Sequence, residues 1–480
     1  MQHTTLDVIR AERNEKLRKI SELAPIYPSN FDKKDTTSSC LGKEGQQVKT
    51  AGRIILIRQQ GKIAFAKLQD ETGQIQLFFQ QKTLSEKDFS LLKLLDMGDI
   101  VGITGKVDKT STGELSVFVD TLEVLTKALR PLPSTWFGLT DQELRYRQRY
   151  LDTIMDPEVM ARFKTRSKLI SSIRRYLESQ GYMEVETPVL QSLYGGANAA
   201  PFKTHLNALD IDMYLHIAVE LYLKRCVIGG MDKVFEIAKD FRNEGMDQSH
   251  SPEFTMLEFY QAYADYNVIM DVTEGLLKFC AQEIFGKQEL TVKGVPIDLS
   301  KPWPRVDIQE LVKQHTGLDY DSLDISNFQA FAKENKIEFN TADSKPLLLY
   351  KIFDSSLVAK KLVGPIWTLN YPIEISPLAK KHPTKEGFVQ RFECYMNGVE
   401  VCDGFSEIND PADQRQRFES QQLGQVDPQP LDEEFIEALE YGMPPTGGIG
   451  IGIERLTMFF TDTWSIREVQ LYPLMRPKND

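Results

Sequence analysis

Charged and aromatic side chains share one face of two predicted strands in residues 234–263, which are joined by a polar loop at 245–252. Strict alternation gives that face a cation, several carboxylates, a phenol and a phenyl ring, and its residues include Glu236, Arg242, Glu244, Phe254, Glu258 and Tyr260. The opposite face carries the apolar residues Phe235, Ile237, Phe241, Leu257 and Phe259. This mixture predicts a site in which Arg242 holds an anionic group and the acids hold an amine. A solvated sheet face is the alternative.

A second predicted hairpin, over residues 389–408, carries two acids that could share a cation. The dipeptide Asn-Gly at 397–398 is typical of a two-residue hairpin turn. The resulting register pairs Glu393 with Cys402 and makes Glu393 and Glu400 diagonal neighbours on one face. Two carboxylates at that spacing repel unless a cation lies between them, and Mg²⁺ is the natural candidate. The alternatives are one protonated acid, or two acids exposed at an edge.

Glycines alternate with isoleucines in the C-terminal segment TGGIGIGIERLTMFF. Gly448, Gly450 and Gly452 then form a strip without side chains, on which a flat ligand can lie against the backbone. The segment is not the dinucleotide-binding fingerprint, because an isoleucine stands where that fingerprint requires glycine. Arg455 is expected to enter an apolar helix, where a buried guanidinium needs an anion. That anion is either a protein carboxylate or an ATP phosphate.

The 480 residues are enough for two or three domains, each with its own core. With 41% hydrophobic and 26% charged residues the composition is that of a soluble globular protein, and no apolar run is long enough to predict a membrane span. The charged N-terminus does not resemble a secretory signal. Five cysteines without metal-ligand spacing favour a reduced, cytoplasmic compartment. The net charge is −12, although residues 1–60 hold eleven Lys or Arg against seven Asp or Glu.

The elements that precede the predicted site have a different pattern. Residues 5–23 are predicted to form an amphipathic helix, which either contacts RNA or packs on the next domain. Residues 48–125 contain about five short strands separated by turns, which is typical of a small closed barrel. Phe65, Gln76 and Glu114 point outward in this pattern, and such side chains suit stacking and hydrogen bonding to unpaired bases. A barrel that packs this face on a neighbouring domain is the alternative.

The chain is therefore predicted to have four parts. They are a lead-in (1–46), a barrel (47–128), a linker (129–150) and a large domain (151–480) with a helical insertion near 280–347. No catalytic pattern is found in the insertion.

Together these segments resemble the class II aminoacyl-tRNA synthetases over nearly the whole chain. Residues 180–188 are similar to the family's first, dimer-forming motif, 241–260 to its second and 448–455 to its third. Three stretches resemble the lysine-specific members more than the aspartate or asparagine relatives: 195–199, 217–225 and 404–410. The resemblance implies an α+β fold, with a five-stranded OB-fold barrel that binds the anticodon. A catalytic domain built on a six-stranded antiparallel sheet flanked by helices would follow.

The resemblance also implies the reaction and its ligands. L-lysine would be activated by ATP to lysyl-adenylate and pyrophosphate, and then transferred to the 3′ end of tRNA(Lys). The protein would be a homodimer that uses Mg²⁺ and does not associate with membranes. Glu407 and Tyr260 would take the ε-ammonium of lysine, and Arg242 would hold both its carboxylate and the α-phosphate of ATP.

Each implied role falls on named positions of this sequence. Arg242 and Arg455 would be catalytic. ATP binding would involve Arg242, Glu244, His250, Phe254, Glu393, Gly450, Gly452 and Arg455. Lysine binding would involve Gly196, Glu220, Arg242, Glu258, Tyr260 and Glu407. Glu393 and Glu400 would hold the metal, and Phe65, Gln76 and Glu114 would read the anticodon.

Two residues depart from the family pattern. Ala200 stands where Arg is usual, and Asp403 stands where Asn usually precedes Gly404. Alternation places Asp403 on the face opposite Glu400, so a modest effect is expected. Two other functions stay open. A non-catalytic RNA-binding relative is disfavoured by the intact charged residues of the site, and a ligase that lysylates another protein is disfavoured by the barrel.

Overall fold

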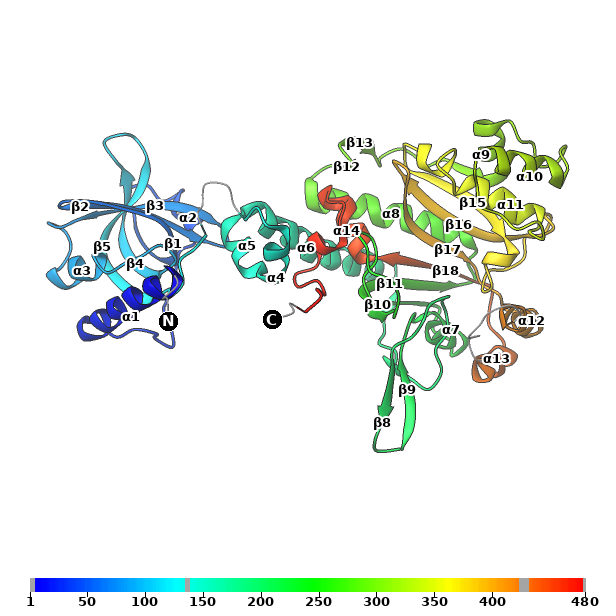
Figure 1. The fold of residues 1–480 in the computed structure, drawn as a ribbon, viewed down its shortest axis with the longest axis horizontal. Helices are drawn as coiled ribbons and strands as arrows, with labels where there is room; N and C mark the ends of the chain where they lie inside the picture. The colour runs from blue at the N-terminus through cyan, green and yellow to red at the C-terminus, as the bar shows by residue number, and fades with distance from the viewer. Residues whose placement is uncertain (1–4, 134–138, 423–430, 478–480) are drawn as a thin grey trace. The chain divides into compact units, whose positions relative to one another are not determined.

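The computed structural model describes residues 5–133, 139–422 and 431–477. The chain divides into two compact units, residues 1–160 and 161–480 (Figure 1). The predicted α+β class, with an N-terminal barrel followed by a domain built on a large sheet, is confirmed. Across the described residues, no helix is both long enough and apolar enough to cross a membrane. All five cysteines are free thiols.

The first unit is built around a closed barrel of five strands in the order β1-β2-β3-β5-β4 (Figure 1). The strands are β1 (Gln47–Gln60), β2 (Ile63–Asp70), β3 (Gly73–Gln80), β4 (Ile100–Lys109) and β5 (Leu115–Thr126). Alternate residues of each strand enter the core, as Ala64, Ala66 and Leu68 do on β2. The helices are α1 (Thr5–Leu23), α2 (Thr37–Cys40), α3 (Glu86–Leu92), α4 (Gln142–Arg147) and α5 (Arg149–Met155). Helix α4 lies inside the range predicted as a linker.

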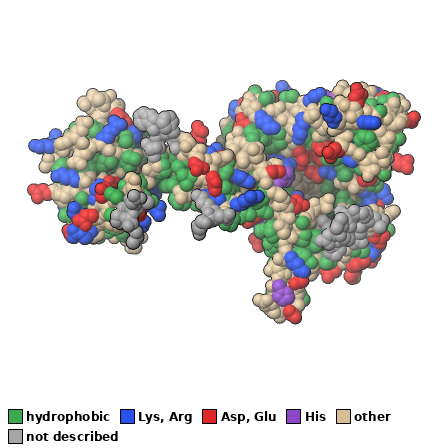
Figure 2. Space-filling model, viewed as in Figure 1, with side chains coloured by type: hydrophobic (Ala, Val, Ile, Leu, Met, Phe, Trp, Pro, Cys, Tyr) green, Lys and Arg blue, Asp and Glu red, His purple; other side chains and the backbone are tan. Residues whose placement is uncertain are grey.

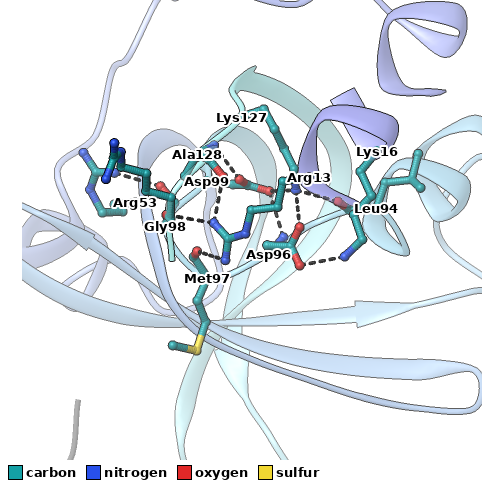
Figure 3. A network of polar contacts seen from close by, with 11 residues as sticks. Arg13, Lys16, Arg53, Leu94, Asp96, Met97, Gly98, Asp99, Lys127 and Ala128 are labelled. Carbon is teal, nitrogen blue, oxygen red and sulfur yellow. Dashed lines mark hydrogen bonds and ion pairs between the residues drawn. The ribbon is translucent and has the colours of Figure 1, made fainter. Parts of the chain in front are cut away.

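Helix α1 has the predicted bounds and packs on the barrel through a buried guanidinium. Arg13 is 8% exposed and donates hydrogen bonds to the carbonyl oxygens of Met97, Ala128 and Arg130 (Figure 3). A buried guanidinium is stable only when its donors have acceptors, and these three carbonyls supply them. Of the two predictions for this helix, packing on the barrel is therefore confirmed.

A second buried cation lies beside Arg13. Lys127 is fully buried, and its Nζ lies 2.6 Å from Asp96 and 2.8 Å from Asp99 (Figure 3). Lys16 of α1 reaches the same Asp96 at 2.6 Å. Asp96 therefore accepts hydrogen bonds both from Lys16 on α1 and from Lys127, the residue that follows β5. These two bonds hold α1 to the segment after β5.

The second unit is built on an eight-stranded sheet in the order β14-β15-β16-β17-β18-β11-β10-β6. In chain order these strands are β6 (Met183–Glu184), β10 (Lys233–Phe241), β11 (Glu253–Ala262), β14 (Arg305–Asp307), β15 (Ile366–Pro372), β16 (Phe388–Met396), β17 (Val399–Ser406) and β18 (Thr446–Gly452). The six central strands are antiparallel, as predicted. The predicted count of six is nevertheless wrong, because β6 and β14 add a parallel strand at either edge. These strands have two and three residues, which is too short for an alternation pattern to reveal.

Helices cover one face of this sheet, whereas helices cover the other face only in part. Helices α6 (Pro157–Ser179), α8 (Tyr266–Phe285) and α14 (Ile453–Thr461) bury their apolar stripes against strand residues such as Phe235, Phe259 and Ile451. The remaining helices are α7 (Glu220–Ile228), α9 (Ile308–Thr316), α10 (Ile325–Glu334), α11 (Lys345–Phe353), η1 (Ala359–Lys361), η2 (Ile373–Ile375), α12 (Pro411–Gln422), α13 (Glu433–Glu440) and α15 (Ile466–Val469).

Two small sheets complete the unit. One has the order β7-β9-β8, from β7 (Leu190–Gln191), β8 (Lys203–Leu206) and β9 (Ile211–Leu215). The other is a hairpin of β12 (Glu289–Val292) and β13 (Val295–Asp298), which lies inside the range predicted as a helical insertion. That range therefore holds strands as well as helices, and through β14 it also supplies one edge of the main sheet.

Candidate active site

A cavity of about 800 Å³ opens on the polar face of the large sheet. Its volume lies within the roughly 300–1,000 Å³ that is usual for small-molecule sites. Figure 2 shows this side of the larger unit hollowed, with acidic side chains inside the hollow. Its lining includes these predicted site residues: Gly196, Glu220, Arg242, Glu244, His250, Phe254, Glu258, Tyr260, Glu400, Glu407, Gly450, Gly452 and Arg455. Glu393 does not belong to the lining.

Arg242 follows β10 directly and projects into the cavity above an aromatic ring. Its guanidinium carbon lies 5.0 Å from the centroid of Phe254, and its Nε donates to the carbonyl of Ile217 at 3.2 Å. The backbone N–H of Arg242 donates to Pro252 at 2.9 Å, which ties the strand end to the start of β11. Because the hydrogen bond to Ile217 uses Nε, the two terminal nitrogens of the guanidinium can bind an anion in the cavity. Stacking on the ring limits the rotation of the guanidinium.

Three buried carboxylates and one buried ammonium lie together beside the cavity. Glu220 and Lys224 are one turn apart on α7, with Lys224 Nζ 2.6 Å from Glu220 Oε1. The same Nζ contacts Oε2 of Glu407, which directly follows β17. On β11, Tyr260 donates its hydroxyl to Glu258 at 2.8 Å. The group is acidic overall, because three carboxylates face one ammonium.

Burial dominates the titration of this acidic group. It raises the pKa of Glu407 and of Glu258 well above the usual range, and in Glu407 the ammonium of Lys224 opposes the rise. Burial alone lowers the pKa of Lys224, but Glu220 and Glu407 more than offset it, so that pKa is raised. Lys224 is therefore charged at neutral pH. A further ammonium placed against these acids would favour their ionised forms and be held by them.

The hairpin of β16 and β17 turns at Asn397 and Gly398, as predicted, with φ of 45° and 70°. The predicted register is confirmed for the pair next to the turn, Tyr395 with Glu400, and is wrong beyond that pair. A β-bulge shifts the pairing, so that Glu393 lies opposite Asp403 and Cys394 lies opposite Cys402.

The bulge also changes which acids line the cavity. Cross-strand partners share a face of the sheet, so Asp403 lies on the face of Glu393 and enters the cavity lining beside Glu400. The expectation that Asp403 lies on the opposite face is therefore wrong. The physical reason is the extra residue in β17, which reverses the alternation beyond it.

Glu393 is 4% exposed, and both of its oxygens accept hydrogen bonds. Oε2 accepts from the hydroxyls of Tyr371 and Tyr395, and Oε1 from Arg391, each at 2.9 Å. Arg391 also donates to Asp403 at 2.9 Å. Burial raises the pKa of Glu393 to about 8, although Arg391 opposes the rise. Glu393 therefore anchors Arg391, which itself lines the cavity.

The glycine strip has two parts with different surroundings. A Cβ at Gly448 would lie 2.3 Å from the Tyr260 ring and 2.4 Å from the Glu407 carboxylate. A Cβ at Gly450 would meet nothing nearer than the Met256 sulfur at 3.7 Å. Gly448 thus lets the acidic group pack closely, whereas Gly450 leaves open space over the strand.

Arg455, on α14, is not the buried guanidinium that the sequence predicted. Its side chain is 33% exposed, and its Nη1 lies 3.2 Å from Glu400 Oε1. Of the two predicted anions, a protein carboxylate is present, and the ATP phosphate stays a prediction. On the loop before β11, His250 lines the cavity and pairs with Asp247 at 2.8 Å. Both cationic groups lie where a charged ligand could exchange with their present partners.

Some polar residues of the site were missed by the sequence analysis. Lys224 and Arg391 both contact predicted site acids. The signal for Lys224 was its spacing of four from Glu220 on a helix that is otherwise apolar except for Arg225. Ala200, a departure noted above, is exposed, and its carbonyl accepts from the N–H of Asn243 at 2.8 Å.

On the barrel of the first unit, the predicted outward face forms an aromatic row. The rings of Phe65 and Phe78 stack at 4.8 Å, and Phe118 meets Phe78 edge-on at 5.0 Å. Gln76 donates to Ser116 at 2.9 Å. Glu114 lies just before β5 and is exposed. Half-exposed rings beside amide groups suit stacking on bases, and the anticodon role of these residues stays a prediction.

Comparison with known proteins agrees with this architecture. Residues 141–476 match the family described as "tRNA synthetases class II (D, K and N)", and residues 48–125 match "OB-fold nucleic acid binding domain". A protein named lysine–tRNA ligase from Methanoculleus marisnigri is 45% identical over 99% of this chain and 96% of its own length. Proteins of the same name from Enterococcus faecalis (48%; 92% and 89%) and Carboxydothermus hydrogenoformans (44%; 100% and 100%) are also similar. The chain therefore belongs to the class II tRNA synthetases of the aspartate, lysine and asparagine group.

Proposed function

We propose that the protein is a lysine–tRNA ligase. It activates L-lysine with ATP, releasing pyrophosphate, and transfers the lysyl group to the 3′ end of tRNA(Lys). The observation that carries the proposal is the pairing of Arg242 with the buried acids in one cavity. A ligand with a carboxylate and two ammonium groups matches that arrangement. The names of the similar proteins support the same reaction.

The amino acid is held at both ends in this proposal. Arg242 binds the carboxylate of lysine, and Glu220, Glu258 and the backbone at Gly196 surround its α-ammonium. Glu407 and Tyr260 take the ε-ammonium. A buried carboxylate discriminates strongly against an uncharged side chain, because that side chain would leave the carboxylate without a partner.

ATP lies along the glycine strip in this proposal. Phe254 stacks on adenine, Glu244 contacts the base, and Gly450 and Gly452 leave room for the nucleotide. Arg455 and His250 bind the outer phosphates, for which Arg455 exchanges Glu400 for a phosphate. Attack by the lysine carboxylate oxygen on the α-phosphate needs no covalent enzyme intermediate. Arg242 positions the two reacting groups and offsets the charge that develops at phosphorus.

A divalent cation fits part of the predicted pair. Glu400 lines the cavity and offers a hard oxygen ligand. Glu393 does not fit in the present arrangement, because Tyr371, Tyr395 and Arg391 occupy its oxygens. We therefore propose that Glu400 holds Mg²⁺, which neutralises phosphate charge when it is bound. A role for Glu393 in metal binding remains a prediction.

We further propose a homodimer, in which the partner covers the edge strand β6. Met183, Val189 and Leu190, on and after that strand, are 55%, 43% and 46% exposed. Apolar side chains beside a short edge strand are better covered than solvated. Light scattering during size exclusion tests this, since a monomeric mass at micromolar concentration contradicts it.

The free cysteines agree with the expected cytoplasmic compartment.

The decisive experiment is ATP–pyrophosphate exchange with each of L-lysine, L-aspartate and L-asparagine. We expect exchange with lysine alone, followed by lysylation of tRNA(Lys). Lack of exchange by folded protein would contradict the synthetase reaction. Exchange without tRNA charging would favour a ligase that lysylates another acceptor.

A further inference from the structure

Lys224 is fully buried between two carboxylates that the proposed function assigns to the substrate. Its Nζ lies 2.6 Å from Glu220 Oε1 and also contacts Glu407 Oε2. The centroid of the Phe405 ring is 5.5 Å from the same nitrogen. Lys224 does not line the cavity. Its charge therefore acts on a bound ligand through the two acids that it contacts.

With L-lysine bound, the two ammonium groups of the ligand favour the ionised forms of the three buried acids, and the charges of this group then balance when Lys224 is counted. Glu220, Glu258 and Glu407 supply three negative charges, whereas L-lysine brings two ammonium groups and gives its carboxylate to Arg242. Lys224 offsets one of the three negative charges, so the remaining two match the two ammonium groups. Without it, a buried carboxylate would lack a counter-charge and would take up a proton. A protonated carboxyl attracts an ammonium far less than a carboxylate does.

Glu407 has Lys224 as a buried counter-charge. Glu407 is 1% exposed, and Glu220, Tyr260 and Asp403 are further ionisable groups that act on it. Each of these is an acid, so none can supply a compensating positive charge. The contact with Lys224 also limits the rotation of the Glu407 side chain, because one of its oxygens is held from the side of α7.

The geometry points to Lys224 as a positioning residue for lysine recognition, which orients Glu407 and favours its ionised form so that its carboxylate can receive the ε-ammonium. This inference rests on the proposed function. Lys224 lies behind the cavity wall and does not touch the substrate, so it is not a catalytic residue. A purely structural role for the same ion pairs would stabilise the fold without affecting the choice of ligand.

The test compares Lys224→Met with the wild type in lysine-dependent ATP–pyrophosphate exchange. Loss of one charge-assisted contact predicts a rise of roughly ten- to a hundredfold in the KM for lysine. The kcat at saturating lysine and the KM for ATP should change less than about threefold, because the reacting groups are not displaced. Norleucine lacks the ε-amine, so its inhibition constant should stay unchanged. The preference for lysine over norleucine then falls by the same factor as the affinity for lysine.

Lys127→Met is a matched control. Lys127 is also fully buried and also bridges two acids, Asp96 and Asp99, but it lies in the first unit (Figure 3). Exchange does not involve tRNA, so this variant should lose thermal stability and keep both the KM for lysine and the discrimination against norleucine. A structural role for Lys224 predicts that both variants behave alike.

The outcomes separate the inference from the proposed function. Wild-type protein that catalyses no exchange would overturn the proposed function. Wild-type exchange, together with an unchanged KM and unchanged discrimination in Lys224→Met, would overturn the inference alone. If Lys224→Met does not fold, Lys224→Arg and Lys224→Gln replace it. The arginine keeps the charge and should discriminate better than the glutamine, and equal discrimination by the two variants would overturn the inference.

Discussion

Gly448→Ala should disrupt lysine recognition more than nucleotide binding. The added Cβ would lie 2.3 Å from the Tyr260 ring and 2.4 Å from the Glu407 carboxylate, and a real Cβ contact is rarely shorter than 3 Å. Both neighbours are buried, so neither can move away without disturbing its own contacts. Forcing a methyl group into a packed interior costs about 1–3 kcal/mol. We expect the thermal midpoint of the second unit to fall accordingly.

The catalytic effect follows from which side chains are displaced. Moving the Glu407 carboxylate weakens a charge-assisted contact that is worth about 1.5–3 kcal/mol. At about 1.4 kcal/mol per factor of ten, kcat/KM for lysine should fall roughly ten- to a hundredfold. The KM for ATP should change less, because the atoms nearest to the added Cβ belong to Tyr260 and Glu407 and not to Phe254 or Arg455. Exchange assays that vary lysine and ATP separately measure both quantities.

Gly450→Ala provides the comparison on the same strand. Its Cβ would lie 3.7 Å from Met256 and 3.9 Å from Glu258, which are ordinary contacts. Stability should therefore change by less than about 0.5 kcal/mol. If the nucleotide lies on this strip, the KM for ATP should rise while the KM for lysine is kept. Wild-type lysine kinetics in Gly448→Ala, or a greater loss of stability in Gly450→Ala, would refute this reasoning.

Three further predictions concern other parts of the molecule. Asp403→Asn should change the KM for lysine less than about tenfold, because an amide oxygen can still accept from Arg391; a hundredfold change in exchange assays would contradict this. Phe65→Ala should raise the KM for tRNA at least about tenfold, through loss of base stacking, and leave exchange unchanged. Burial raises the pKa of Asp70, but the hydrogen-bond donors around its carboxylate, which include Lys33, lower the pKa by a larger amount. The net result is a depressed pKa. Its stabilising effect is therefore full above about pH 4 and declines at lower pH as the folded-state carboxylate takes up a proton. Asp70→Asn should speed hydrogen exchange of the β2 and β3 amides at pH 7, by an amount that shrinks in acid.

The sequence predicted those parts of the fold that depend on local patterns. Alternation located the strands of the barrel and of the hairpin at 234–263. The dipeptide of Asn397 and Gly398, two residues that readily adopt the positive φ of a tight turn, identified the turn between β16 and β17. The bulge beyond that turn has no comparable signature, because one extra residue changes the register without changing the residue types. This bulge is therefore the reason why Asp403 was expected on the wrong face of the sheet.

Contacts between segments that are distant in the chain were the second feature that the sequence did not predict. Arg455 was expected to be buried because its helix is apolar, but its position on that helix leaves it at the cavity with Glu400. Lys224 contacts Glu407 across 183 positions of the chain, and no local pattern reports such a pair. Likewise, β6 and β14 are strands only because a neighbouring strand lies beside them.

The attachment of α1 to the barrel has a consequence for synthesis on the ribosome. Arg13 donates to carbonyls that lie 84, 115 and 117 positions further along the chain. At roughly 5–20 residues per second, the last of these acceptors is made about 6 to 23 s after the helix itself. Until then the guanidinium lacks part of its set of acceptors, so its full hydrogen bonding waits for the last strand of the barrel. Docking of α1 would then be completed with the barrel, before the strands of the second unit have been translated.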